Sequence, residues 1–181
     1  MIYDIILAAP PWRFETWSDK GKDRAAEKYY QTMTTAELNR LIVPAAGNAI
    51  LFMWAIWPML PDALELINAW GFEYKTIAWV WLKSNRSGVG FFTGLGYYTR
   101  ANTEPCLLAT RGKPLRPENK GVQSVIYAPV MEHSRKPDDQ YRKIETLYPG
   151  KRYLEMFARR TRPGWHVWGN EVLSDVSVTA A

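Results

Sequence analysis

The chain has 181 residues, of which 47% are apolar and 14% aromatic, so it can bury one sizeable core but not two typical domains. Its net charge of +5 permits attraction to phosphate but does not by itself select a function class. The single cysteine, Cys106, excludes an internal disulfide, and with His133 and His166 it gives no credible zinc-ligand spacing. We therefore expect no metal site and a reducing, cytoplasmic setting.

The chain opens with a dense, β-branched apolar run at residues 2–8, a pattern typical of a strand covered on both faces of a parallel sheet. The run is too short for a signal peptide or a membrane span, so we expect neither secretion nor a membrane partner. Pro10 and Pro11 cannot continue a strand ladder, which predicts a stiff turn at the carboxyl end of this strand. Ligands of open α/β sheets bind at that edge.

Strand and helix patterns alternate along the rest of the chain. Further strands are expected at residues 48–55, 73–83, 104–110, 153–158 and 165–169. Helices are expected at residues 34–42, 58–70 and 137–147, the first opening on a capping box of Thr34 and Glu37. Loops or connections are expected at residues 13–33, 84–98 and 111–136. This alternation predicts a doubly wound α/β sheet in one domain over residues 1–173, followed by a flexible tail at 174–181.

The turn Ala9-Pro10-Pro11-Trp12 is a candidate binding corner. Carbonyl groups fixed by proline can accept hydrogen bonds from an exocyclic amine, and a tryptophan beside them can stack on a base. The same tetrapeptide also fits a plain strand end whose indole fills a pocket. Taken alone, it favours neither interpretation.

Five short segments resemble, in order, the motifs of the MT-A70 family of adenine methyltransferases. Residues 4–12 resemble the region of the family's D-P-P-W motif, and residues 102–107 are similar to the strand that carries a family glutamate. The K-P-D, E-L-F-x-R and G-N-[QE] segments of the family are matched by residues 133–138, 154–159 and 168–171. Each match is short, but together they cover nearly the whole chain and their joint occurrence is highly specific.

The resemblance implies transfer of a methyl group from S-adenosylmethionine to the N6 amine of adenine, with S-adenosylhomocysteine as the second product. It implies an α/β Rossmann-like methyltransferase fold with a mostly parallel, doubly wound sheet, one antiparallel strand and a permuted motif order. The residues that it assigns to the target are Ala9, Pro10, Pro11 and Trp12. The residues that it assigns to the cofactor are Ala8, Lys136, Phe157, Arg159, Asn170 and Glu171.

Each cofactor assignment makes chemical sense. Lys136 suits the methionyl carboxylate, while Asn170 and Glu171 suit ribose hydroxyl groups. Taken singly, each residue would more often be a surface lysine, a structural arginine or a capping amide.

Ala9 departs from the family pattern, which has an aspartate at this position. The carboxylate would accept a hydrogen bond from the N6 amine and keep its lone pair directed at the methyl carbon, which a methyl side chain cannot do. Loss of one such contact lowers the rate about a hundredfold or more. Because the other motifs are intact, we favour an inactivating substitution in an otherwise functional enzyme over a natural pseudo-enzyme.

Two groups of basic residues are expected to flank the site and contact phosphates. Glu104 from the matching strand is also expected to bind the nucleic acid. The first loop contributes Lys20, Lys22, Arg24 and Lys28, and later segments contribute Arg86, Arg100, Arg111, Lys113 and Arg116. An adenine in a duplex must leave the stack to react, at a cost of a few kcal/mol, and Trp12 with the aromatic residues of the 84–98 loop would receive it.

DNA is favoured over RNA as the partner, because the chain is compact and the family has bacterial and phage precedents. RNA N6-adenine methylation is the alternative within the class, and a catalytically inactive nucleic-acid-binding subunit is the alternative outside it. A monomer and a homodimer are both compatible with the sequence.

Overall fold

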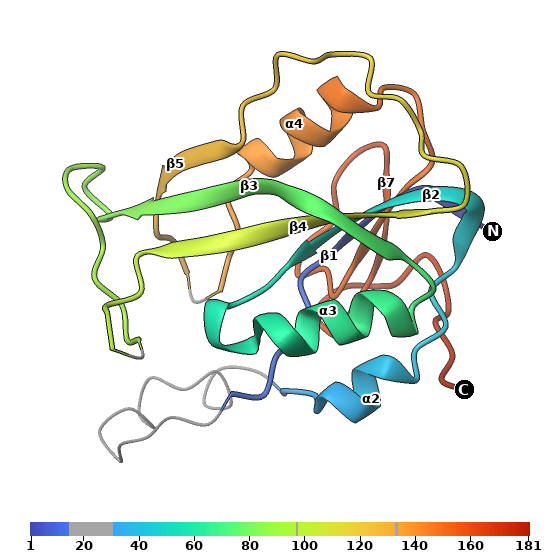
Figure 1. Ribbon diagram of the computed structural model, residues 1–181, viewed down its shortest axis with the longest axis horizontal. Coiled ribbons are helices and arrows are strands. Elements are labelled where there is room, and N and C mark those ends of the chain that lie inside the picture. Colours follow the sequence, from blue (N-terminus) through green and yellow to red (C-terminus); the bar gives the residue numbers. More distant parts are fainter. Residues whose placement is uncertain (15–30, 97, 133) are drawn as a thin grey trace.

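A seven-stranded sheet forms the centre of the computed structural model, which describes residues 1–14, 31–96, 98–132 and 134–181 (Figure 1). Its strands are β1 (Tyr3–Ala8), β2 (Ala45–Trp54), β3 (Glu73–Ser84), β4 (Thr103–Arg111), β5 (Val125–Pro129), β6 (Tyr153–Met156) and β7 (Trp165–Trp168). They lie in the order β5-β3-β4-β2-β1-β6-β7. Strand β4 runs antiparallel to β2 and β3, and the other neighbouring pairs of this sheet are parallel.

Helices cover both faces of the sheet. They are α2 (Thr35–Asn39), α3 (Leu60–Ala69), which follows a 3-10 turn at Trp57–Met59, and α4 (Asp139–Leu147). Figure 1 shows α3 and α4 on opposite sides of the sheet, with α2 beside α3. The sheet is therefore doubly wound, mostly parallel and crossed by one antiparallel strand, which confirms the expected Rossmann-like methyltransferase fold.

Each central strand sends alternate side chains into two hydrophobic cores. From β1, Ile6 and Ala8 enter the core beneath α3, whereas Ile5 and Leu7 enter the core beneath α4. All four side chains are 0–1% exposed. Burial of a large aliphatic side chain stabilises a fold by about 1.5–3 kcal/mol, so β1 gives the turn that follows it a rigid base.

The predicted helices and strands agree with the structure to within a few residues, except that one strand was missed, and most of the expected loop at 13–33 lies outside the described residues. The capping box is present, because the Glu37 amide donates to the Thr34 hydroxyl at 3.2 Å and the Thr34 amide donates to the Glu37 carboxylate at 2.7 Å. Strand β5 was not predicted, since it lies within the expected connection at 111–136. It is a five-residue edge strand that ends at Pro129, where a missing amide hydrogen is tolerated.

The C-terminal residues lie against the body of the protein. The Ile42 amide donates to the Thr179 carbonyl at 2.8 Å, and Val176 and Val178 pack against the core beneath α3. The division of the chain at residue 173 and the flexibility of the tail stay predictions. No helix within the described ranges is long and apolar enough to cross a membrane.

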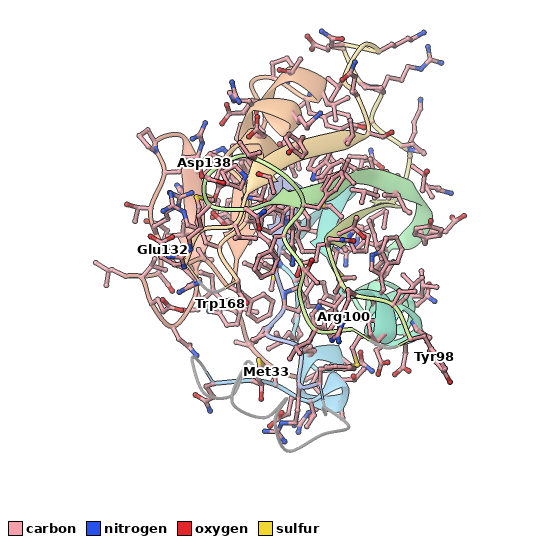
Figure 2. All side chains as sticks on the ribbon, turned by 90° about the vertical axis from the view of Figure 1, so that its left-hand side faces the viewer. Met33, Tyr98, Arg100, Glu132, Asp138 and Trp168 are labelled. Atoms are coloured by element: carbon pink, nitrogen blue, oxygen red, sulfur yellow. The ribbon has the colours of Figure 1, made fainter. Side chains whose placement is uncertain are left out.

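The parallel strands end together at one edge of the sheet, called here the carboxyl edge. Strand β4 runs the other way, so it begins there and ends at the opposite, amino edge. Figure 2 looks onto the carboxyl edge, with Tyr98 and Arg100 on one side and Glu132 and Asp138 on the other. Every motif that resembles the MT-A70 family ends or begins at this edge.

Candidate active site

The turn at residues 9–12 is fastened to the ends of the neighbouring strands. The Ala9 amide donates to the Met156 carbonyl at 3.4 Å, and the Trp12 indole donates to the Trp54 carbonyl at 3.2 Å. The Pro10 carbonyl accepts a hydrogen bond from the Trp12 amide at 2.9 Å, and the Pro11 carbonyl accepts one from the Met33 amide at 2.9 Å. Each of these two carbonyl oxygens therefore keeps one free lone pair. Only 6% of Trp12 is exposed, so the indole braces the turn and offers little surface to a base.

A shallow depression lies between this turn, the end of β6 and the start of α4. Its lining includes Ala9, Trp54, Lys136, Glu155, Phe157 and Arg159. The depression thus joins the predicted catalytic turn to residues from the C-terminal third of the chain. Trp12 is buried and does not line the depression, and Asn170 is exposed on the turn that follows β7.

A charged cluster of Lys83, Glu104 and Lys136 lies beside the depression. Lys136 donates to one Glu104 oxygen at 2.8 Å, and the Lys83 ammonium lies 3.6 Å from the other oxygen. The three side chains are 12–17% exposed. The Lys136 ammonium is 5.6 Å from the ring centre of Trp54, and the Lys83 ammonium is 5.0 Å from that of Trp81. The indole faces therefore add to the stabilisation of both cations.

The partners of Glu104 determine its charge state. Burial alone would raise the pKa of the carboxyl group, but Lys136 and Lys83 outweigh burial and bring that pKa below its usual value. Burial lowers the pKa of Lys83, and Glu104 opposes this change. The cluster thus holds a carboxylate ionised in a nearly water-free position.

The pKa of a second carboxyl group, that of Glu155, is shifted in the opposite direction. It accepts hydrogen bonds from the Tyr141 hydroxyl at 2.9 and 3.1 Å. Burial raises the pKa of Glu155 to about 7, although the Tyr141 hydrogen bond acts to lower it. Burial and the neighbouring Glu155 raise the pKa of Tyr141 in turn. Glu155 can therefore gain or lose a proton near neutral pH, on the lining of the depression.

The chain leaves β6 through a strained and closely packed turn. Phe157 has a φ of 64°, which a non-glycine residue rarely adopts, and its ring stacks on Trp70 at 6.5 Å between ring centres. The Ala158 amide donates to the Trp168 carbonyl at 2.9 Å. A Cβ on Gly169 would lie 2.3 Å from the Ala158 carbonyl oxygen, so this approach requires glycine. The predicted E-L-F-x-R and G-N-[QE] segments are thereby locked together.

Two predicted cofactor residues contact each other at this edge. The Arg159 guanidinium donates to the Glu171 carboxylate at 3.0 Å, and both side chains are about two-fifths exposed or more. Sequence reasoning missed Lys83, Tyr141 and Gln140, the last of which lines the depression and accepts from the Trp54 indole at 2.7 Å. The position of Lys83 at the end of a predicted strand was a usable signal, whereas the two α4 residues had none.

The predicted nucleic-acid residues are divided between the two edges of the sheet. Arg86 and Arg100 are exposed beyond the carboxyl ends of the strands. Arg111 and Lys113 lie at the amino edge, so the structure does not bring them to the site. The expected contacts Lys20, Lys22, Arg24 and Lys28 lie outside the described residues.

The Arg111 side chain is instead part of the fold. Its guanidinium donates to the carbonyl groups of Trp70, Gly71 and Ala45, with the Gly71 bond at 3.2 Å and the Ala45 bond at 3.3 Å. It also lies 4.7 Å from the ring centre of Phe72. Arg111 thus caps the end of α3 and joins it to the start of β2.

A Rossmann-like methyltransferase is the class that the sheet and its carboxyl-edge site define. The family model described as MT-A70 matches residues 3–171, and the chain belongs to this family of N6-adenine methyltransferases. It is 31% identical over 188 residues to the type II methyltransferase M.MunI of Mycoplasma sp, covering 94% of this chain and 78% of that protein.

Longer eukaryotic proteins are also similar. The chain is 32% identical over 175 residues to the N(6)-adenosine-methyltransferase catalytic subunit METTL3 of Homo sapiens, and 31% identical to the MT-A70-like protein of Drosophila melanogaster. Both matches cover 94% of this chain, but it spans only 28% and 27% of the length of these relatives.

Proposed function

We propose that this chain is built to transfer a methyl group from S-adenosylmethionine to the N6 amine of adenine in DNA, and that Ala9 impairs the transfer. The observation that supports this proposal is the shared depression, in which Ala9 lies with Lys136, Phe157 and Arg159. Of the relatives above, the one whose length is covered most fully carries the name of a type II methyltransferase, which favours DNA over RNA.

The donor set of the depression fits S-adenosylmethionine. The methionyl part of the cofactor carries an ammonium and a carboxylate, and the lining offers both a lysine ammonium and a carboxyl group, from Lys136 and Glu155. Asn170 and Glu171 would hold ribose hydroxyl groups from the turn after β7. When bound, the cofactor supplies an electrophilic methyl group on its sulfonium.

The chain's own residues then have separate tasks. The proline-fixed turn would hold the adenine through carbonyl oxygens that keep one free lone pair each. The charged cluster of Lys83, Glu104 and Lys136 would hold the Lys136 ammonium in place beside the depression. Residue 9 would orient the N6 amine, and the methyl side chain of Ala9 has no acceptor with which to do so.

Restoring the acid by Ala9→Asp tests the proposal. We expect methyl transfer to adenine-containing DNA to rise about a hundredfold or more, as measured with radiolabelled cofactor and by mass spectrometry of N6-methyladenine. Ala9→Ser is the matched control, because it adds a polar group without the carboxylate and should recover far less. If Ala9→Asp produced no gain on either DNA or RNA, Ala9 would not be the residue that limits transfer.

One observation favours a second candidate, a nucleic-acid-binding subunit without methyl transfer. Ala9 removes the acid that transfer needs, and binding does not depend on it. Titration of the unmodified chain with S-adenosylmethionine in a calorimeter separates the two functions. Measurable heat supports an enzyme whose cofactor site is intact, whereas its absence together with tight binding of oligonucleotide supports the subunit.

A further inference from the structure

An exposed aromatic pair lies at the carboxyl edge, outside the depression. Phe91 is 60% exposed on the loop between β3 and β4, and Tyr127 is 55% exposed on β5. Their ring centres are 6.1 Å apart and their planes meet at 87°. Figure 1 shows this loop projecting past the end of β3 and the start of β4. Two exposed rings in contact offer an apolar surface on which a flat ligand could pack.

The loop holds Phe91 in a defined position. The Asn85 amide donates to the Gly90 carbonyl at 3.1 Å, and the Asn85 side chain donates to the Val89 carbonyl at 2.9 Å. The Tyr127 hydroxyl donates to the Gly88 carbonyl at 3.4 Å, which ties β5 to the same turn. A surface that is already ordered loses little entropy when a ligand binds.

Charge selects the kind of ligand. Residues 85–102 include Arg86 and Arg100 but neither aspartate nor glutamate. Arg86 donates to the Met131 carbonyl just after β5, so a cation lies at the end of the strand that carries Tyr127. Aromatic faces beside cations, without nearby acids on the loop, suit a polyanion with flat bases.

The aromatic pair is connected to the site through one residue. The Lys83 carbonyl accepts from the Phe92 amide at 2.8 Å, directly after Phe91, while the Lys83 ammonium lies 3.6 Å from Glu104. The aromatic pair and the charged cluster therefore share the carboxyl edge, so a nucleic-acid strand whose adenine enters the depression could also reach the pair.

We propose that Phe91 and Tyr127 form a stacking platform for an unpaired base that flanks the target adenine, so that the substrate is engaged as locally single-stranded nucleic acid. This inference rests on the proposed function and adds the strand state of its substrate. A base in a duplex has its faces covered by its neighbours, whereas an unpaired base can stack on a side chain.

Affinity for fluorescent oligonucleotides tests the platform in the unmodified Ala9 chain, without methyl transfer. Phe91→Ala and Tyr127→Ala should each weaken binding of a single-stranded, adenine-containing oligonucleotide about tenfold, since stacking contributes about 1–3 kcal/mol per base. Phe91→Trp should keep the affinity. Leu173→Ala, at another exposed apolar position, is the control for nonspecific effects and should change nothing.

The oligonucleotide can be altered to match the protein variants. An abasic nucleotide beside the adenine should reduce affinity as much as Phe91→Ala does, and the two changes together should be no worse than one. An unchanged affinity for single strands in Phe91→Ala, or an equal loss for fully paired duplex, would overturn the platform. Sedimentation of the free protein is the third measurement, because a dimer that dissociates in Phe91→Ala would show a protein contact instead.

The two proposals fail separately. If Ala9→Asp gained no activity while oligonucleotide binding still depended on Phe91, the platform would stand without the proposed chemistry. If Ala9→Asp became active while Phe91→Ala bound normally, only the platform would be lost.

Discussion

The two edges of the sheet use charged side chains in opposite ways. At the amino edge, Arg111 donates to backbone carbonyl groups of the elements that it joins. At the carboxyl edge, the charged side chains pair with one another instead: Glu104 lies between Lys83 and Lys136, and each lysine ammonium lies near a tryptophan ring.

The difference separates stability from function. Removing charges from water is expensive, and apolar side chains of similar volume often stabilise a protein as well as a buried ion pair does. A fold alone therefore does not require the cluster at the carboxyl edge, whereas the proposed site for a charged cofactor would use it. At the amino edge, the Arg111 guanidinium donates to carbonyl groups that lack a donor within their own helix or strand, so its role there is structural.

Glu104→Gln should have the largest effect on stability. It leaves two lysine ammonium groups facing each other without their carboxylate, and removal of one partner from a buried ion pair costs about 3–5 kcal/mol. Urea unfolding at pH 7 measures the change. Glu73→Gln breaks an exposed pair with Lys75 and should cost less than about 1 kcal/mol, so a comparable loss in both variants would contradict the assignment of a buried cluster.

The acid dependence of stability gives an independent test of the same cluster. Because the folded pKa of Glu104 lies below its ordinary value, its contribution is present above that value and is lost as pH falls through the folded pKa. Between the two pKa values the unfolded chain binds more protons than the folded one. Glu104→Gln should therefore remove part of the acid destabilisation.

Arg111→Met should cost about 2–3 kcal/mol, somewhat less than the change at Glu104. The apolar stem is retained, while the carbonyl groups at the end of α3 lose a charged donor. Arg116→Met, at an exposed position, should change the free energy of unfolding by less than about 0.5 kcal/mol. Oligonucleotide affinity, compared at equal folded fraction, should be normal in Arg111→Met. A selective loss in Arg111→Met would show that this residue contacts phosphate.

The sequence predicts the strands and helices, but not which charged residues lie at which edge of the sheet. Apolar periodicity located β1 and β2, and the capping pattern located α2, because both signals come from neighbouring residues. Glu104 and Arg111 both belong to β4, and only the direction of that strand decides which of them reaches the site. Motif resemblance implied an antiparallel strand without saying which one it is. The basic residues of the chain could therefore not be sorted by edge.

Contacts between distant segments were also beyond sequence reasoning. The bond between Tyr141 and Glu155 joins α4 to β6. Glu155 belongs to the segment that resembles E-L-F-x-R, but nothing in the sequence pairs it with Tyr141. The sequence likewise does not single out Tyr127, whose strand is short and ends in proline. Local patterns predicted the scaffold, whereas the environment of each charged group depends on tertiary packing.

Glu155→Gln should change the pH dependence of stability by about 2–3 kcal/mol between pH 5 and 8. The folded pKa of about 7 lies above the ordinary value of 4.5, so the folded state binds more protons between these limits. The contribution of Glu155 is fully present below pH 4.5 and is lost as pH rises through about 7. In Glu155→Gln this decline should disappear, as thermal unfolding between pH 5 and 8 can show. A decline of equal size in the variant would place the titrating group elsewhere.

Arg159→Gln should have the smallest effect on the fold and a clear effect on the cofactor. Its ion pair with Glu171 is exposed, and such pairs contribute about 0–1 kcal/mol, so the unfolding midpoint should move little. The same side chain lines the depression, so calorimetry should show weaker binding of S-adenosylmethionine. Arg142→Gln, in an exposed pair on α4, is the matched control and should leave that affinity unchanged. Weaker cofactor binding without loss of stability would mark the carboxyl edge as the ligand edge. Normal cofactor binding with a clear loss of stability would instead give Arg159 a structural role, like that of Arg111 at the amino edge.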